Sequence, residues 1–335
     1  MSTSPIMSAL SLAAATTMAL MPVSPLRADT PLNVVSYVKD GGSGGSRCES
    51  IANACSDIAL AVHLTQQGGQ IVIVGTAIAI HEATFILKSV SITNDGGGTA
   101  ITTPDAPFSD VKTIRITAGP GDVVSLRGLI IDGGNFQTSG IDIEQASAVH
   151  IQKCVVRNYQ AIGAWSISDT RSTGGKLFIS DTLIDNNGSN AASGGILLQP
   201  TGTGSLDVVL DRVHLENNVV GLWADGRQST GNGVHAVIRD SVVSGNDGDG
   251  IFAGSAAGKA PAFVAVQHTS AVGNAGVGIH ADGPHATIVL DENFLTRNGS
   301  GISAGNSGQL ISFGNNRNFN NLGAEGEATS LFAPK

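Results

Sequence analysis

Residues 206–225, LDVVLDRVHLENNVVGLWAD, contain the repeating unit that decides the fold of this chain. An alternating apolar run is followed by a polar corner, a short apolar segment, an Asn, and a Gly that opens a second alternating run. The same order returns at residues 262–282, AFVAVQHTSAVGNAGVGIHAD. A strand-forming repeat of this length predicts a solenoid, in which each unit is one coil. Six units, 24 to 31 residues apart, are marked by Asn158, Asn187, Asn218, Asn246, Asn274 and Asn298.

Apolar residues recur in fixed columns when the units are aligned on these Asn residues. Ten positions before the Asn stand Leu177, Val208, Ala236, Val264 and Ile288. Eight positions before it stand Ile179, Leu210, Ile238, Val266 and Leu290, and three before it Ile184, Leu215, Val243, Ala271 and Leu295. The first two columns indicate one strand with period two, and the third indicates a second strand after a bend. The run after the Gly adds a third strand, so the unit predicts a three-sided parallel solenoid. Stacked Asn side chains in the αL conformation are expected at its corner.

Composition agrees with many short strands joined by tight turns. Gly accounts for 44 of 335 residues, while aromatic residues make up 4% and charged residues 13%. An apolar fraction of 41% is too high for a disordered chain. The net charge is −9 and there is no run of Lys or Arg, which excludes a nucleic-acid partner.

The N-terminal 28 residues are expected to be a signal peptide. Residues 6–21 are apolar or small, and a plausible cleavage point follows Ala28. We therefore expect an exported protein, periplasmic or extracellular, with no membrane span in the mature chain. Cys48 and Cys55 could form a disulfide in an oxidising compartment, or stay free. Cys154 lies inside the repeat and is expected to be an inert, buried thiol.

Four segments are expected along the chain. After the signal peptide at 1–28, residues 29–69 form an entry segment with a short capping helix at Ser56–Gln66, N-capped by Ser56 and stopped by Gly68-Gly69. Residues 70–320 form the solenoid, and residues 321–335 form a C-terminal tail.

The segment CESIANACSDIALAVHLTQQGGQIVIV, residues 48–74, and the coils CVVRN, LIDNN, HLENN, VVSGN, FLTRN and SFGNN carry a resemblance to a known family. They resemble exported bacterial right-handed parallel β-helix proteins of the pectate-lyase-like superfamily, over roughly residues 34–320. The resemblance implies an all-β right-handed parallel β-helix of about 8–10 coils with an N-terminal capping helix. It also implies a function of the kind found in this superfamily, which contains polysaccharide lyases, hydrolases, epimerases and esterases, alongside adhesins and tailspikes.

The catalytic signatures of those enzymes are missing here. The chain has no Asp-Asp pair and no Gly-His-Gly, and its Asp282-Gly283-Pro284-His285 has the residues of an Asp-Pro-His motif in the wrong register. No His-x-x-x-His spacing occurs, so no metal site and no cofactor are expected. Calcium is compatible with the superfamily but is not indicated, because the Asp residues lie mostly at corners.

One outward column of the third strand stands out. It is predicted to contain Asp142, Trp165, Leu197, Trp223, Phe252, His280 and Ser303, so that an aromatic stripe of Trp165, Trp223, Phe252 and His280 runs along one face. Two positions on, the outward column reads Glu144, Ile167, Gln199, Asp225, Gly254, Asp282 and Gly305. Aromatic rings stack on the apolar faces of sugars, and paired carboxylates can act as acid and base.

This pattern predicts a partner that is a polysaccharide or cell-surface glycan, bound by Trp165, Trp223, Phe252 and His280. Asp225, His280 and Asp282 are the candidate catalytic residues of a polysaccharide lyase or glycoside hydrolase, but the sequence does not decide whether the protein is an enzyme. Loops could instead cover the stripe, so that it binds no ligand. The alternative functions are a non-enzymatic structural or adhesive surface protein, or a protein-binding solenoid. The sequence also leaves the oligomeric state open.

Overall fold

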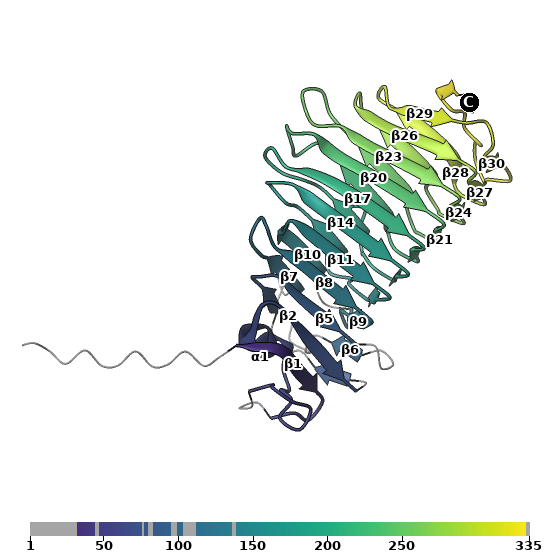
Figure 1. Ribbon diagram of the computed structural model, residues 1–335. Coiled ribbons are helices and arrows are strands. Elements are labelled where there is room, and N and C mark those ends of the chain that lie inside the picture. The colour runs from purple at the N-terminus through teal and green to yellow at the C-terminus, as the bar shows by residue number, and fades with distance from the viewer. Residues whose placement is uncertain are drawn as a thin grey trace, which may run out of the picture. The chain divides into compact units, whose positions relative to one another are not determined.

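The computed structural model describes residues 32–43, 47–75, 77–79, 83–94, 99–102, 112–135 and 139–332, and the expected signal peptide lies outside this part. Here the chain winds through three parallel sheets, which we name A, B and C, with one strand of each in every complete coil. Figure 1 shows the coils stacked in chain order, from purple to yellow. The expected three-sided parallel solenoid is confirmed, and the nine strands of sheet C in the described residues agree with eight to ten coils.

The three sheets contain the following strands. Sheet A consists of β1 (Asn33–Lys39), β2 (Thr65–Val74), β5 (Val90–Thr93), β8 (Val123–Arg127), β11 (Ala148–Gln152), β14 (Gly175–Ser180), β17 (Ser205–Asp211), β20 (Gly233–Arg239), β23 (Ala262–Gln267), β26 (Ala286–Asp291), β29 (Gln309–Ser312) and β31 (Ser330–Leu331). Sheet B consists of β3 (Ala77–Ala79), β6 (Thr99–Thr102), β9 (Leu129–Asp132), β12 (Val155–Arg157), β15 (Leu183–Asp185), β18 (His214–Glu216), β21 (Val242–Ser244), β24 (Ser270–Val272), β27 (Phe294–Thr296) and β30 (Arg317–Asn318). Sheet C consists of β4 (Thr84–Ile86), β7 (Lys112–Thr117), β10 (Ser139–Gln145), β13 (Trp165–Asp169), β16 (Gly194–Leu198), β19 (Val220–Asp225), β22 (Ile251–Gly254), β25 (Val277–Asp282) and β28 (Ser300–Gly305).

The apolar columns form the core. Leu177 pairs with Val208 and Val208 with Ala236, and the column continues through Val264 and Ile288. All five side chains are almost completely buried. Parallel pairing places each aliphatic residue on its counterpart in the next coil, so the buried column is continuous and the hydrophobic effect acts along the whole stack.

A ladder of buried Asn side chains holds the corner between sheets B and C. The Nδ2 of Asn246 donates to Oδ1 of Asn274 at 2.7 Å, and that of Asn274 donates to Oδ1 of Asn298 at 2.8 Å. Asn187 donates to Asn218 in the same way at 2.8 Å. Each rung thus satisfies a buried amide with the next rung's carbonyl oxygen, as the sequence predicts.

The expected αL conformation belongs to the residue before the ladder Asn. Asn186 and Asn217, for example, have φ of 57° and 53°, while the ladder residues after them are not left-handed. Asn158 is not a ladder residue, contrary to the sequence prediction. It lies beside Asn186, the residue before the ladder Asn, and its Oδ1 accepts a hydrogen bond from the side chain of Asn186 at 2.7 Å. Tyr159 takes the ladder position instead, and its backbone N–H donates to Asn187 at 3.1 Å.

A short helix covers the first coils. α1 (Ile58–Leu64) is shorter than the expected Ser56–Gln66, and its N-cap is Asp57, whose carboxylate accepts from the N–H of Ala59, rather than Ser56. The helix ends at Leu64, and β2 begins at the next residue, Thr65. Gly68-Gly69 therefore lies within a strand and does not stop the helix. With β1 and β31 included, sheet A extends on both sides of residues 70–320.

The three cysteines lie in different settings. Cys48 and Cys55 form a disulfide, and their backbone carbonyl groups accept from the N–H groups of Tyr37 and Lys39 along the edge of β1. Cys154 is free and buried, and burial raises the pKa of its thiol to about 11. A thiol held protonated in this way is unreactive at neutral pH.

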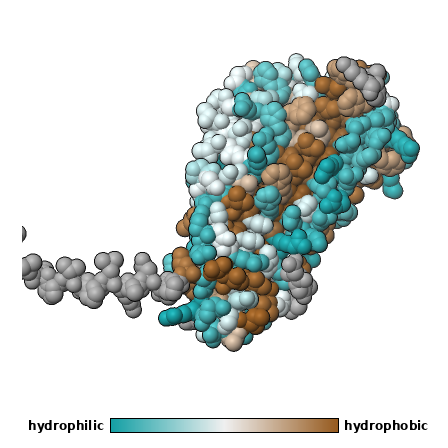
Figure 2. Space-filling model, in the orientation of Figure 1, coloured by the Kyte–Doolittle hydropathy of each residue, from teal (hydrophilic) through white to brown (hydrophobic). Residues whose placement is uncertain are grey.

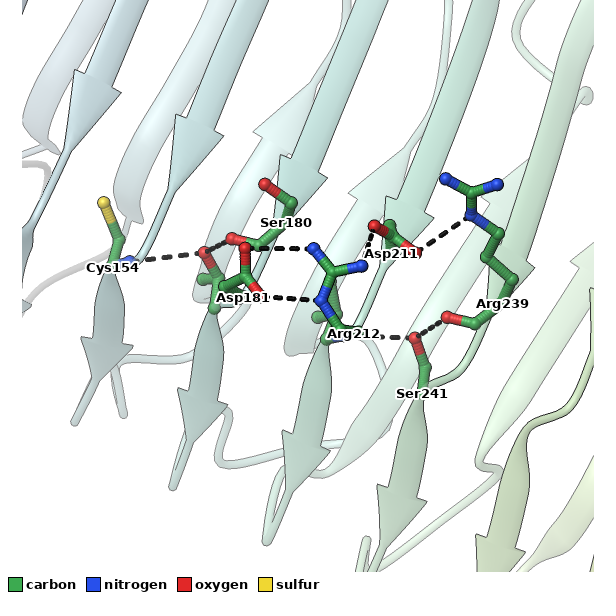
Figure 3. A network of polar contacts seen from close by, with 9 residues as sticks. Cys154, Ser180, Asp181, Asp211, Arg212, Arg239 and Ser241 are labelled. Carbon is green, nitrogen blue, oxygen red and sulfur yellow. Dashed lines mark hydrogen bonds and ion pairs between the residues drawn. The ribbon is translucent and has the colours of Figure 1, made fainter.

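Alternating charges line the corner between sheets A and B (Figure 3). The Nε of Arg212 donates to Oδ1 of Asp181 at 2.7 Å, and the Nε of Arg239 donates to Oδ1 of Asp211 at 2.9 Å. Arg212 also contacts Asp211, so the guanidinium groups alternate with carboxylates from coil to coil. The hydrogen bond from Arg212 holds the pKa of Asp181 below its usual value.

Candidate functional site

Three of the predicted stripe residues lie side by side on sheet C. Strand pairing places Trp223 of β19 beside Phe252 of β22, and Phe252 beside His280 of β25. The ring centroids of both neighbouring pairs are 5.0 Å apart, with interplanar angles of 68° and 84°. All three side chains are half-buried, so the loops in the described part of the chain leave the column partly exposed. Because the rings meet edge to face, they form a ridged surface rather than the flat row of parallel rings that even spacing suggests.

Trp165 does not belong to this column. Ile167 pairs with Ile141 and Ile196. Trp165 lies two positions before Ile167 on the strand and pairs with Gly194. The column position is therefore held by Ser168, and Ile167 points inward and is fully buried. In this coil Ser166 stands before the inward residue, where the neighbouring coils have a Gly, while Gly163 lies in the turn before the strand, so the Gly pattern gives the wrong register.

The ring of Trp165 nevertheless supports the column. Its exposed fraction is 7%, and its ring packs edge to face on Trp223 at a centroid distance of 6.0 Å. The guanidinium carbon of Arg227 lies 5.1 Å from the ring centroid of Trp223. Trp223 thus contacts both a buried indole and a cation, which restrict its orientation.

A groove of about 530 Å³ opens over β19 and β22. Trp223, Phe252 and Val220 provide apolar walls, Asp247 and Asp249 provide carboxylates, and Asn190 belongs to the turn that closes one side. The indole N–H of Trp223 is buried without a hydrogen-bond partner. The groove combines apolar rings with a few polar groups, as is common in sites for small molecules or sugar units.

Asp225 is already committed to an ion pair. Its carboxylate is buried and accepts from the Nε of Arg227 at 2.8 Å, from Nη2 at 3.0 Å, and from the side chain of Gln199 at 2.7 Å. The hydrogen bond with Asp225 raises the pKa of Arg227. A carboxylate held in this way positions Arg227 against Trp223, and its role as a catalytic residue stays a prediction.

His280 forms the clearest acid–base pair near the groove, with a partner that the sequence did not reveal. Its Nδ1 lies 2.8 Å from Oδ2 of Asp249, and Oδ1 of Asp249 accepts from the N–H of Val277 at 2.7 Å. Asp249 is one of the Asp residues that the sequence places at corners. Asp249 stands just before the third strand of its coil, and His280 lies on the third strand of the next coil. Alignment of the two coils could therefore have predicted that these side chains lie close together. Asp282, the remaining candidate, is half-buried and accepts from Asn306 at 2.7 Å.

Two further properties bear on the kind of site. Among the residues that the structure describes, no group of three or more His, Cys, Asp or Glu side chains is arranged to hold a metal ion. No helix in the same part of the chain is long and apolar enough to cross a membrane.

The fold defines the class of protein. The family described as "Right handed beta helix region" matches residues 113–295, more than half of the chain, so this chain belongs to that family and is a right-handed parallel β-helix. No curated protein sequence matches the chain.

Two solved structures show the same fold. The pectate lyase Pel9A aligns with a TM-score of 0.56 and 13% identity, over 84% of this chain and 75% of its own. The alginate lyase from Paenibacillus sp. str. FPU-7 aligns with a TM-score of 0.58 and 10% identity, over 90% of this chain and 100% of its own. At such low identity these similarities establish the fold alone.

Proposed function

We propose that this protein is exported and binds a polysaccharide or cell-surface glycan in the groove over β19 and β22. The observation that carries the proposal is the half-exposed ring column of Trp223 and Phe252 inside a groove whose polar groups are carboxylates. Sugars offer apolar C–H faces to aromatic rings and hydroxyl donors to carboxylates, so both features have a complement on one ligand. The superfamily, whose two solved relatives above are polysaccharide lyases by name, supports the same class of ligand.

The Cys48–Cys55 disulfide supports export. Structural disulfides persist in oxidising compartments such as the periplasm and the exterior of the cell. N-terminal sequencing of the protein secreted by its own host tests this: the proposal expects a mature chain that begins after Ala28.

Glycan binding is tested by affinity electrophoresis against a panel of neutral and acidic polysaccharides. The proposal expects retardation by at least one polymer, and at least about a fivefold loss of affinity in Trp223→Ala, since truncation of an aromatic anchor costs about 1 kcal/mol or more. The matched control is Phe263→Ala, which removes a partly buried ring from the outer face of sheet A. Figure 2 shows that apolar side chains also gather along that face. Loss of binding in Phe263→Ala but not in Trp223→Ala would place the ligand on sheet A and contradict the proposal.

The His280–Asp249 pair favours a second, catalytic function on the same groove. A carboxylate on Nδ1 fixes the tautomer and orientation of an imidazole, whose Nε2 can then exchange a proton with a bound sugar. Incubation with the polymers that bind, followed by assays for unsaturated and reducing ends, tests this function. Product that disappears in His280→Gln while binding persists supports it, and the absence of product from every bound polymer means that the protein is a binding protein.

A further inference from the structure

The charges around the groove indicate which glycans it accepts. Asp247 is exposed at its rim, Asp249 lines its wall, and Asp282 is half-buried on the next strand beyond Phe252's coil. The groove itself is lined by two of these carboxyl groups, those of Asp247 and Asp249, which both belong to the turn before β22, and Asp249 also contacts Nδ1 of His280.

The nearest cation does not compensate for them. Arg227 lies over Trp223, but its guanidinium is bonded at two nitrogens to the buried carboxylate of Asp225. A guanidinium that is neutralised by a buried partner has little attraction left for an anionic ligand.

Cations further along the same face of sheet C are also paired. Lys112 lies 2.5 Å from Asp142 and 3.5 Å from Glu144, and Arg115 lies 2.5 Å from Glu144. In the described part of sheet C, then, basic side chains of the outer face stand beside acidic ones. The face offers no basic track for a chain with one carboxylate on every sugar.

We propose that the groove selects uncharged glycans and rejects polyuronates. The proposal rests on the glycan binding proposed above and names the class of ligand. Apolar walls from Val220, Trp223 and Phe252 suit the C–H faces of a neutral sugar, and the carboxylates of Asp247 and Asp249 accept hydrogen bonds from its hydroxyl groups. A uronate in the same position adds a carboxylate among carboxylates, and repulsion of like charges reduces its affinity.

The test compares pairs of hexasaccharides that differ only in oxidation at the sixth carbon: mannose against mannuronate, glucose against glucuronate, and galactose against galacturonate. Calorimetric titration of the full chain at low salt is expected to show the neutral member of a pair binding at least tenfold tighter than its acidic partner. Added salt should leave neutral binding within about twofold, because screening acts on charges.

Two variants assign the selection to the groove. Asp247→Lys reverses a charge at the rim and is expected to raise affinity for the acidic hexasaccharides roughly tenfold. Affinity for the neutral hexasaccharides should fall severalfold, because an acceptor for their hydroxyl groups is lost. Asp207→Lys makes the same change in net charge at an exposed site on the outer face of sheet A and is expected to have no such effect.

Each outcome decides between the proposals. Tighter binding of an acidic hexasaccharide than of its neutral partner overturns the selection for uncharged glycans. If Trp223→Ala weakens that binding, the proposal that glycans bind in the groove is still supported. An equal gain in Asp247→Lys and Asp207→Lys overturns the assignment to the rim, because only net charge then matters. Failure of all six hexasaccharides and of every polymer in the panel overturns glycan binding altogether.

Discussion

Removal of one amide from the Asn ladder is the perturbation whose cost follows most directly from the structure. Asn246 is 1% exposed, and its Oδ1 accepts from the backbone N–H of Asn218 at 2.9 Å. Its Nδ2 donates to the backbone oxygen of Leu215 at 3.1 Å and to Oδ1 of Asn274 at 2.7 Å. Asn246→Ala leaves the buried N–H of Asn218 without this acceptor, at a cost of about 1–3 kcal/mol, and removes two further hydrogen bonds of about 1 kcal/mol each. We therefore expect a loss of about 3–5 kcal/mol in the free energy of unfolding.

The assay is equilibrium unfolding in urea followed by circular dichroism, with the slope of the transition compared between variants. Asp247→Ala is the matched control, because it truncates the next residue at an exposed site and should stay within about 0.5 kcal/mol of the unmodified chain. A loss below about 1 kcal/mol in Asn246→Ala, equal to that of the control, would refute the view that the ladder stabilises the corner.

Three further predictions concern other parts of the molecule. Arg171 and Asp169 form a fully buried ion pair with a 2.5 Å contact, so Arg171→Leu should cost about 3–5 kcal/mol in urea unfolding by leaving a buried carboxylate unpaired, and a cost below 1 kcal/mol would contradict this. The hydrogen bond from Arg212 lowers the pKa of Asp181. The pair therefore stabilises the fold at a pH above the usual carboxyl pKa of about 4, and this stabilisation is lost as the pH falls through the pKa of Asp181 in the folded state. Asp181→Asn should therefore flatten the fall of melting temperature on acidification, and an unchanged pH profile would refute the assignment. Trp223→Phe removes a buried N–H that has no partner, so it should keep the unfolding free energy within about 1 kcal/mol, whereas a loss above 2 kcal/mol would show that this N–H is satisfied.

The repeat determined the fold because each coil obeys the same two local rules. Residues such as Val208 and Leu215 alternate or recur at fixed distances from an Asn, and parallel stacking turns that spacing directly into a buried column. Errors appeared where a coil departs from the rule. Tyr159 replaces the ladder Asn in one coil. Trp165 stands three positions before its expected place, which Ser168 holds, because Ser166 replaces the Gly that precedes the inward residue in the neighbouring coils.

The site was only partly predictable, since its parts depend on contacts between coils. Alternation along the strand was enough to bring Trp223, Phe252 and His280 together. It could not show that Arg227 turns back onto Asp225, because that contact depends on the path of a loop. The pairing of His280 with Asp249 likewise depends on side-chain direction across two coils.

The most direct test of the glycan groove uses the two tryptophans of the chain. In Trp165→Phe, Trp223 is the sole source of indole fluorescence, and it lies in the wall of the groove. Titration with a hexasaccharide that binds by calorimetry should shift or quench this emission with the same midpoint as the heat signal. Calorimetric binding without any change in the emission of Trp223 would show that the glycan binds elsewhere and would contradict the central claim.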